Sequence, residues 1–158
     1  MCTAMTFPQG GEHYFGRTLD LDRSLGERVV AAPRNYPLRF RAAGTLERHY
    51  AMIGMALAGE DYPLYYEAAN EAGLAMAGLN FPGNARYAAP AEGRDNVASF
   101  ELIPWMLGQC ADVEQAEGLL ARLNLTDASF REDLPPAPLH WMLADGRRTI
   151  VVEAMEDG

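Results

Sequence analysis

The feature that most constrains the fold is the order in which two kinds of hydrophobic pattern occur along the chain. Short apolar or alternating runs, typical of β-strands, occupy the first half and are separated by turn residues. These runs cover residues 3–7, 13–19, 28–32, 50–57, 65–69 and 74–79. Two segments with helical spacing follow, and strand-like runs at 139–143 and 149–154 come last. This order is typical of an α+β domain and not of alternating parallel βαβ units.

Turn residues and helix signals give the elements more detail. The tetrapeptides PQGG at 8–11 and NEAG at 70–73 predict two hairpins, because Gly and Asn tolerate positive φ. Residues 81–96 are rich in Pro, Gly, Asn and Ala and predict a surface loop. Ser99 is the expected N-cap of a first helix, and Asp112 with Gln115 predicts a capping box for a second. The expected buried face of the second helix comprises Val113, Ala116, Leu120 and Leu123.

Composition predicts one ordinary globular domain and limits its partners. Of 158 residues, 49% are hydrophobic and 22% charged, which is typical of a chain with a real core. The net charge of −9 argues against nucleic acid or an anionic membrane as a partner. No apolar run reaches the roughly 18 residues that a membrane helix needs, and no signal peptide is visible. We therefore expect a cytoplasmic protein, in which Cys2 and Cys110 are more readily reduced than joined in a disulfide.

Cys2 is the first candidate for chemistry. A second-position Cys becomes the amino terminus once Met1 is removed, and one residue then carries both a nucleophile and a base. The α-amino pKa of about 7.7–8.0 leaves part of that group neutral near pH 7, so it can accept the thiol proton. If 3–7 and 13–19 pair, Arg17 returns level with the chain start and can stabilise a thiolate. Asp20 can hold the protonated amino group by a charge-assisted hydrogen bond.

Five segments in register resemble the choloylglycine hydrolase family, which comprises bile salt hydrolases and penicillin V acylases. They are MCTA at 1–4, FGRTLD at 15–20, NEAGL at 70–74, AGLNFP at 77–82 and PLHWMLAD at 138–145. The tetrapeptide APRN at 32–35 and the DYP loop at 61–63 fit the same order. The resemblance implies the αββα sandwich of an N-terminal-nucleophile (Ntn) hydrolase. Family members are considerably longer, so we expect residues 1–158 to be the amino-terminal part of one such domain, with an incomplete sandwich.

The resemblance also implies site residues and a reaction. Cys2 is the implied nucleophile with its α-amino group as general base, and Arg17 and Asp20 are implied to lie beside the thiol and the amine. Asn80 matches a family position that helps form the oxyanion hole, although an Asn in a loop also commonly bonds its own backbone. Leu19 and Leu139 match positions that line the apolar substrate pocket. The implied reaction is hydrolysis of the amide of a glycine- or taurine-conjugated bile salt.

Several alternatives stay open at this point. Penicillin V acylases tend to carry Tyr where this chain has Asn80, which favours bile salts, but penicillin V or another N-acyl amide remains an alternative substrate. The chain could also be an inactive truncated half-domain. A Cys–His dyad is disfavoured because His13, His49 and His140 lack a local signature. No metal-ligand spacing or phosphate loop occurs, so we expect no metal and no cofactor. The resemblance further implies a homo-oligomer.

Overall fold

A six-stranded antiparallel sheet forms the body of the protein. The computed structural model describes residues 2–59 and 62–156. The strand order is β12-β11-β8-β7-β6-β3. Its strands are β3 (Arg28–Ala32), β6 (Met52–Ala58), β7 (Pro63–Asn70), β8 (Ala75–Asn80), β11 (Leu139–Ala144) and β12 (Thr149–Glu153). All six correspond to runs predicted from the sequence, and the predicted α+β class is confirmed.

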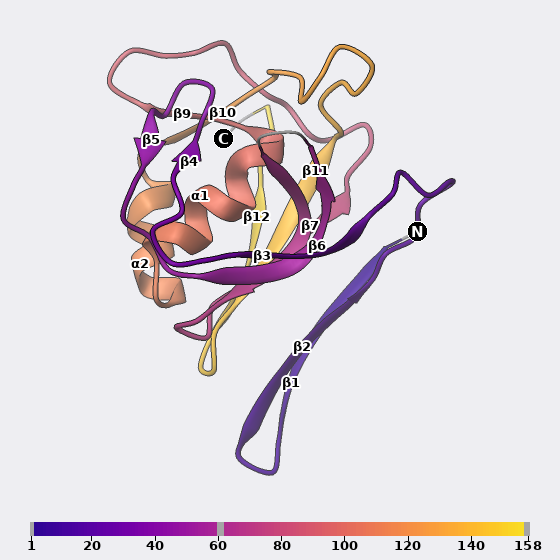
Figure 1. Ribbon diagram of the computed structural model, residues 1–158, viewed down its shortest axis with the longest axis vertical. Coiled ribbons are helices and arrows are strands. Elements are labelled where there is room, and N and C mark those ends of the chain that lie inside the picture. The colour runs from indigo at the N-terminus through magenta and orange to yellow at the C-terminus, as the bar shows by residue number, and fades with distance from the viewer. Residues whose placement is uncertain (1, 60–61, 157–158) are drawn as a thin grey trace.

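Helices cover one face of this sheet. The helices are η1 (Ser99–Glu101), α1 (Leu102–Gln109) and α2 (Val113–Leu120), and α1 packs mainly against β7 and β8 (Figure 1). Every residue of α1 except Gln109 is buried, because the helix lies between the sheet and the loops. Apolar side chains from the facing strands complete the core, among them Met76, Trp141 and Leu143. Their burial supplies the main stabilisation of the fold.

The amino-terminal hairpin projects from this body. Strands β1 (Thr3–Gln9) and β2 (Glu12–Thr18) pair antiparallel and extend away from the six-stranded sheet (Figure 1). Gly10 and Gly11 form the two-residue turn, both with positive φ, the conformation that suits such a hairpin. The predicted hairpin is therefore confirmed, although Pro8 and Gln9 belong to the strand and not to the turn.

The face of the sheet opposite the helices is unusually apolar. Directly paired residues share a face of an antiparallel sheet, so the register defines one row across it. This row is Val29, Met55, Glu67, Ala77, Met142 and Val151. Val29 and Val151, at its two ends, are each more than half exposed. Glu67 is the single charged member of the row.

Some sequence predictions were wrong in detail. Ser99 is not the N-cap of α1, because a 3₁₀ turn precedes the helix and Glu101 takes that position. Asp112 does cap α2, but the Gln115 side chain accepts from Ala111 N–H and so does not close the expected box. Leu123 does not belong to that helix. It begins β10 (Leu123–Thr126), which pairs in parallel with β9 (Asp95–Ala98). The short pair β4 (Leu38–Arg39) and β5 (Thr45–Leu46) was also missed.

Candidate active site

A pocket of about 200 Å³ lies where the root of the β1–β2 hairpin meets one end of the six-stranded sheet. All six residues predicted from the sequence line it: Cys2, Arg17, Leu19, Asp20, Asn80 and Leu139. The remaining wall is mostly apolar and includes Leu64, Phe100, Ile103, Phe130, Leu134 and Trp141. An apolar pocket with a few convergent polar groups is the usual form of a small-molecule site. Met1 lies outside the described residues.

Pairing within the hairpin places Cys2 in the pocket. Thr3 N–H donates to Thr18 Oγ1 at 3.0 Å and closes the root of the hairpin, so Cys2 lies beside the segment that follows β2. The Cys2 thiol is half-buried, and its Sγ lies 4.0 Å from the backbone oxygen of Asp20, a long sulfur hydrogen bond. The start of the chain and residues 19–20 therefore form one wall of the site.

Arg17 reaches the pocket from β2 and is held by the sheet. Its side chain is only 4% exposed. Nη1 donates to Glu67 Oε2 at 2.9 Å, and Nη2 donates to the Gly78 carbonyl at 3.0 Å. Nε is buried without a hydrogen-bond partner among the described residues, as is Tyr66 Oη, and both residues line the pocket. Buried polar groups of this kind usually have partners, so both are available to a ligand.

Glu67 is the residue of this constellation that sequence reasoning missed. Burial raises the pKa of its carboxyl, and the hydrogen bond and positive charge of Arg17 oppose that rise. Its signal in the sequence is a single charge inside the otherwise uncharged strand PLYYEAAN. A lone carboxylate in such a strand needs a partner, but the strand alone does not reveal which one.

Asn80 and Leu139 come to the pocket from neighbouring strands. They are directly paired in the register of β8 and β11. Their side chains enter at the end of the sheet, where both strands leave the ladder. A hydrogen-bonding amide and an apolar wall therefore stand side by side at the mouth of the pocket.

The histidines and the second cysteine lie elsewhere. His13 contacts Thr6 within the hairpin, His140 stacks on Phe81, and His49 uses both ring nitrogens on backbone carbonyls. None of them lines the pocket, so the structure brings together no Cys–His dyad among the described residues. Cys110 is not disulfide-bonded, and burial, with a smaller effect of Asp112, raises the pKa of its thiol to about 11.

The described residues contain neither a metal-binding cluster nor a membrane-spanning helix. Within 2–59 and 62–156 there is no group of three His, Cys, Asp or Glu residues arranged to hold a metal ion. No helix in the same part of the chain has the length and apolar character to cross a membrane.

Comparison with known proteins agrees with this geometry. Residues 2–158 match the family model described as linear amide C–N hydrolases, choloylglycine hydrolase family. A bile salt hydrolase/transferase of Lactiplantibacillus plantarum is 47% identical over the whole chain, which spans 48% of that relative. The crystal structure of the C2A mutant of the conjugated bile acid hydrolase from Clostridium perfringens superposes with a TM-score of 0.93 at 32% identity, over 99% of this chain and 49% of that one.

A more distant structure shares the fold. The penicillin V acylase of Agrobacterium tumefaciens matches with a TM-score of 0.77 at 20% identity, over 99% of this chain and 47% of that one. The chain thus spans about half the length of the relatives it matches, so its Ntn-hydrolase fold is an incomplete αββα sandwich, with one helical layer on one sheet. The match of the family model over nearly the full sequence shows that this chain belongs to the choloylglycine hydrolase family of linear amide C–N hydrolases.

Proposed function

We propose that the protein hydrolyses the amide bond of glycine- or taurine-conjugated bile salts, with Cys2 as the nucleophile. The observation that carries this proposal is the convergence of Cys2, Arg17, Asp20 and Asn80 on one largely apolar pocket. The names of the bile salt and bile acid hydrolases to which the chain is similar support the choice of substrate. The 158 residues are proposed to be the amino-terminal part of a single Ntn-hydrolase domain.

The proposed reaction uses the amino terminus as both nucleophile and base. After removal of Met1, the Cys2 thiol gives its proton to the α-amino group, and Sγ attacks the amide carbonyl carbon. The Asn80 side chain donates to the oxyanion of the tetrahedral intermediate. The ammonium proton then passes to the leaving nitrogen, the C–N bond breaks, and glycine or taurine departs from a thioester. Water attacks the thioester, gives a proton to the α-amino group, and regenerates the thiol as the bile acid leaves.

The surrounding residues support this chemistry. Arg17 lines the same pocket as Cys2, and a cation there is proposed to stabilise the nucleophilic thiolate. Asp20 is proposed to hold the protonated α-amino group. Leu19 and Leu139 belong to the apolar wall that would bind the steroid acyl group. Assembly into a homo-oligomer stays a prediction.

The test combines intact mass with product release. The mass of purified protein reports removal of Met1, and glycocholate, taurocholate and penicillin V are supplied in parallel while the released product is quantified. We expect bile-salt turnover that falls by orders of magnitude in Cys2→Ala. Cys110→Ala is the matched control, because Cys110 is buried outside the pocket, and it should keep turnover.

Each result has a definite meaning. Turnover of penicillin V alone would replace the proposed substrate but keep the mechanism. Full activity in Cys2→Ala, or in protein that retains Met1, would refute the mechanism. Absence of turnover from all three substrates would favour an inactive half-domain.

A further inference from the structure

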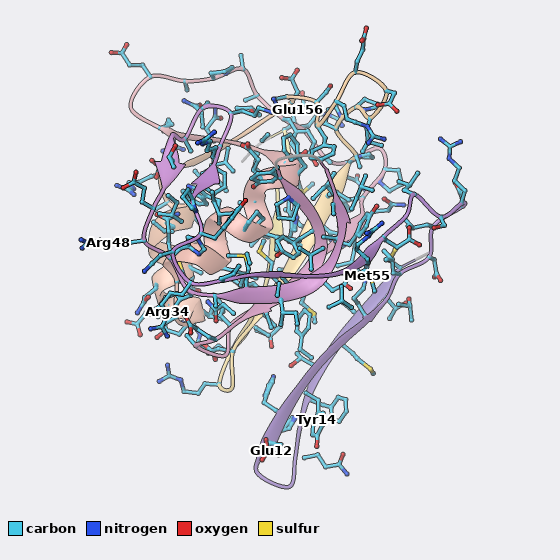
Figure 2. All side chains as sticks on the ribbon, in the orientation of Figure 1. Glu12, Tyr14, Arg34, Arg48, Met55 and Glu156 are labelled. Atoms are coloured by element: carbon cyan, nitrogen blue, oxygen red, sulfur yellow. The ribbon has the colours of Figure 1, made fainter. Side chains whose placement is uncertain are left out.

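Glu67 occupies a position that the packing of its own sheet does not explain. Its neighbours across the strands are Met55 on β6 and Ala77 on β8, so it sits in the middle of the apolar row of the sheet. Figure 2 labels Met55 on the side of the sheet toward the hairpin. The Glu67 side chain is 24% exposed, and burial is the main cause of its raised pKa. A carboxylate retained at such a place costs desolvation free energy that a partner must offset.

That partner is Arg17, which reaches across from a separate element. Positions 15 and 17 of β2 point toward the sheet, whereas Tyr14 is exposed on the opposite side (Figure 2). The Arg17 guanidinium is then fixed at two points, Glu67 on β7 and the Gly78 carbonyl on β8. Two anchors on adjacent strands define the plane of a rigid guanidinium fork, and its Nε has no partner within 2–59 and 62–156.

We propose that Glu67 is the positioning residue that fixes the Arg17 guanidinium beside the Cys2 thiol. Glu67 does not line the pocket, so it acts only through Arg17. The inference rests on the roles of Cys2 and Arg17 in the proposed function. It goes beyond them because it assigns a task to a residue that the catalytic arrangement does not otherwise use.

Two effects of Glu67 on the thiol have opposite signs, which makes the proposal testable. As a negative charge, Glu67 disfavours a nearby thiolate, so its removal by itself should speed alkylation of Cys2. As the anchor of Arg17, Glu67 favours the thiolate, so its loss should slow alkylation of Cys2 once the guanidinium moves away. The other ionisable groups that line the pocket, Asp20, Tyr65 and Tyr66, are the same in every variant. Slower alkylation on removal of Glu67 therefore requires displacement of Arg17.

The experiment measures the rate of iodoacetamide alkylation at Cys2 against pH, by peptide mass spectrometry, after confirmed loss of Met1. We expect Glu67→Ala to shift the rate profile toward higher pH and to slow alkylation about tenfold on its low-pH side, the effect of a one-unit displacement of the profile. Arg17→Met should give an equal or larger shift. Glu67→Gln keeps an oxygen acceptor for Nη1 and should restore the wild-type profile or move it slightly lower.

Controls separate this role from a general loss of structure. Glu117 forms a surface ion pair with Arg148, at 2.7 Å, and Arg148, unlike Arg17, does not line the pocket, so Glu117→Ala should leave the profile unchanged. Cys110 is buried with a raised pKa and should stay unmodified in folded protein, which makes it an internal reporter of unfolding. If Cys110 becomes alkylated in Glu67→Ala, that variant has lost structure and Glu67→Asp is measured in its place. Asp keeps the negative charge but is one methylene shorter than Glu and so cannot reach Arg17 in the same way.

The outcomes discriminate between the two proposals. The positioning role is overturned if folded Glu67→Ala gives a rate profile that is unchanged or displaced toward lower pH while Arg17→Met displaces it toward higher pH. Where Glu67→Asp takes the place of Glu67→Ala, an unchanged profile overturns it in the same way. No shift in Arg17→Met refutes the proposed action of Arg17 on the thiol, and the positioning role falls with it. An upward shift in Glu67→Gln as well as in Glu67→Ala supports positioning and shows that the anchor requires the negative charge.

Discussion

The side chain of Asn70 makes four hydrogen bonds that tie the β7–β8 turn to the end of α1, and their loss should strongly destabilise the protein. Its side-chain amide donates to the carbonyls of Leu107 and Cys110 at 2.8 and 2.7 Å. Its side-chain oxygen accepts from the N–H groups of Ala72 and Leu74 at 3.1 and 3.0 Å. The residue is 7% exposed, so water cannot easily replace these bonds. The turn and the helix end therefore depend on one side chain.

The magnitude follows from the number of bonds. Each intramolecular hydrogen bond contributes about 0.5–1.5 kcal/mol net, so removal of four by Asn70→Ala should cost about 4 kcal/mol. That is a large share of the roughly 5–15 kcal/mol by which a typical domain is stable. At about 2–4 °C per kcal/mol for a chain of this size, the Tm should fall by roughly 8–16 °C. Two carbonyls at the end of α1 would lose their partners, as helix ends do without caps.

Urea unfolding followed by circular dichroism measures this change. Asn84→Ala is the matched control, because Asn84 is exposed and its side chain makes no hydrogen bond within the described residues, and it should stay within about 0.5 kcal/mol of wild type. Asn70→Asp places a carboxylate against two carbonyls, so its deficit relative to wild type should shrink as acid protonates it. A loss below about 1 kcal/mol in Asn70→Ala would mean that water satisfies the site and would refute the reasoning.

Two glycines and one buried carboxylate give further predictions for the same assay. A Cβ on Gly54 would lie 2.6 Å from Ala68 Cα, so Gly54→Ala should lower the free energy of unfolding by several kcal/mol. Gly118→Ala in α2 meets open space and should raise it by up to about 1 kcal/mol. A small loss of stability in Gly54→Ala would show that the strands can separate. Burial opposes ionisation of Asp145, but backbone N–H donors from Val113, Arg147 and Arg148 outweigh it and lower its pKa. The stabilisation by Asp145 is therefore present above its unfolded pKa of about 3.9 and lost as pH falls through the lower folded value, so Asp145→Asn should destabilise at pH 7 and match wild type in strong acid; a deficit independent of pH would contradict this.

The sequence carries strong local signals for most of this architecture. The Gly10-Gly11 turn and the alternating runs beside it predict the hairpin because the turn chemistry and the strand pattern agree. The same agreement predicts β7 and β8 around Asn70. Cys2, Arg17 and Asp20 were predicted from the chemistry of a terminal Cys and from the hairpin, whereas Leu19, Asn80 and Leu139 came only from a family resemblance, since nothing in the spacing of Cys2, Asn80 and Leu139 places them together.

The features that sequence reasoning missed depend on contacts between distant segments. Strands β9 and β10 have four residues each, and their parallel pairing joins segments on either side of both helices. A run that short has no clear period of its own. Ser99 has the right residue type for an N-cap, but the chain makes a 3₁₀ turn there, and Pro104 then falls in the first turn of α1, where its missing N–H costs nothing.

The register of the hairpin connects its distant turn to the chemistry of the pocket. Ala4 pairs with Arg17 and Thr3 with Thr18, and this register is set by the two-residue turn at the far end. A slip of one residue would turn the Arg17 side chain to the opposite face of β2, away from Glu67 and Gly78. It would also separate Thr3 from Thr18 and so release Cys2 from the segment at Asp20. Gly10 and Gly11, which lie outside the pocket, are thus a structural condition for bringing the proposed nucleophile and its cation to the same place.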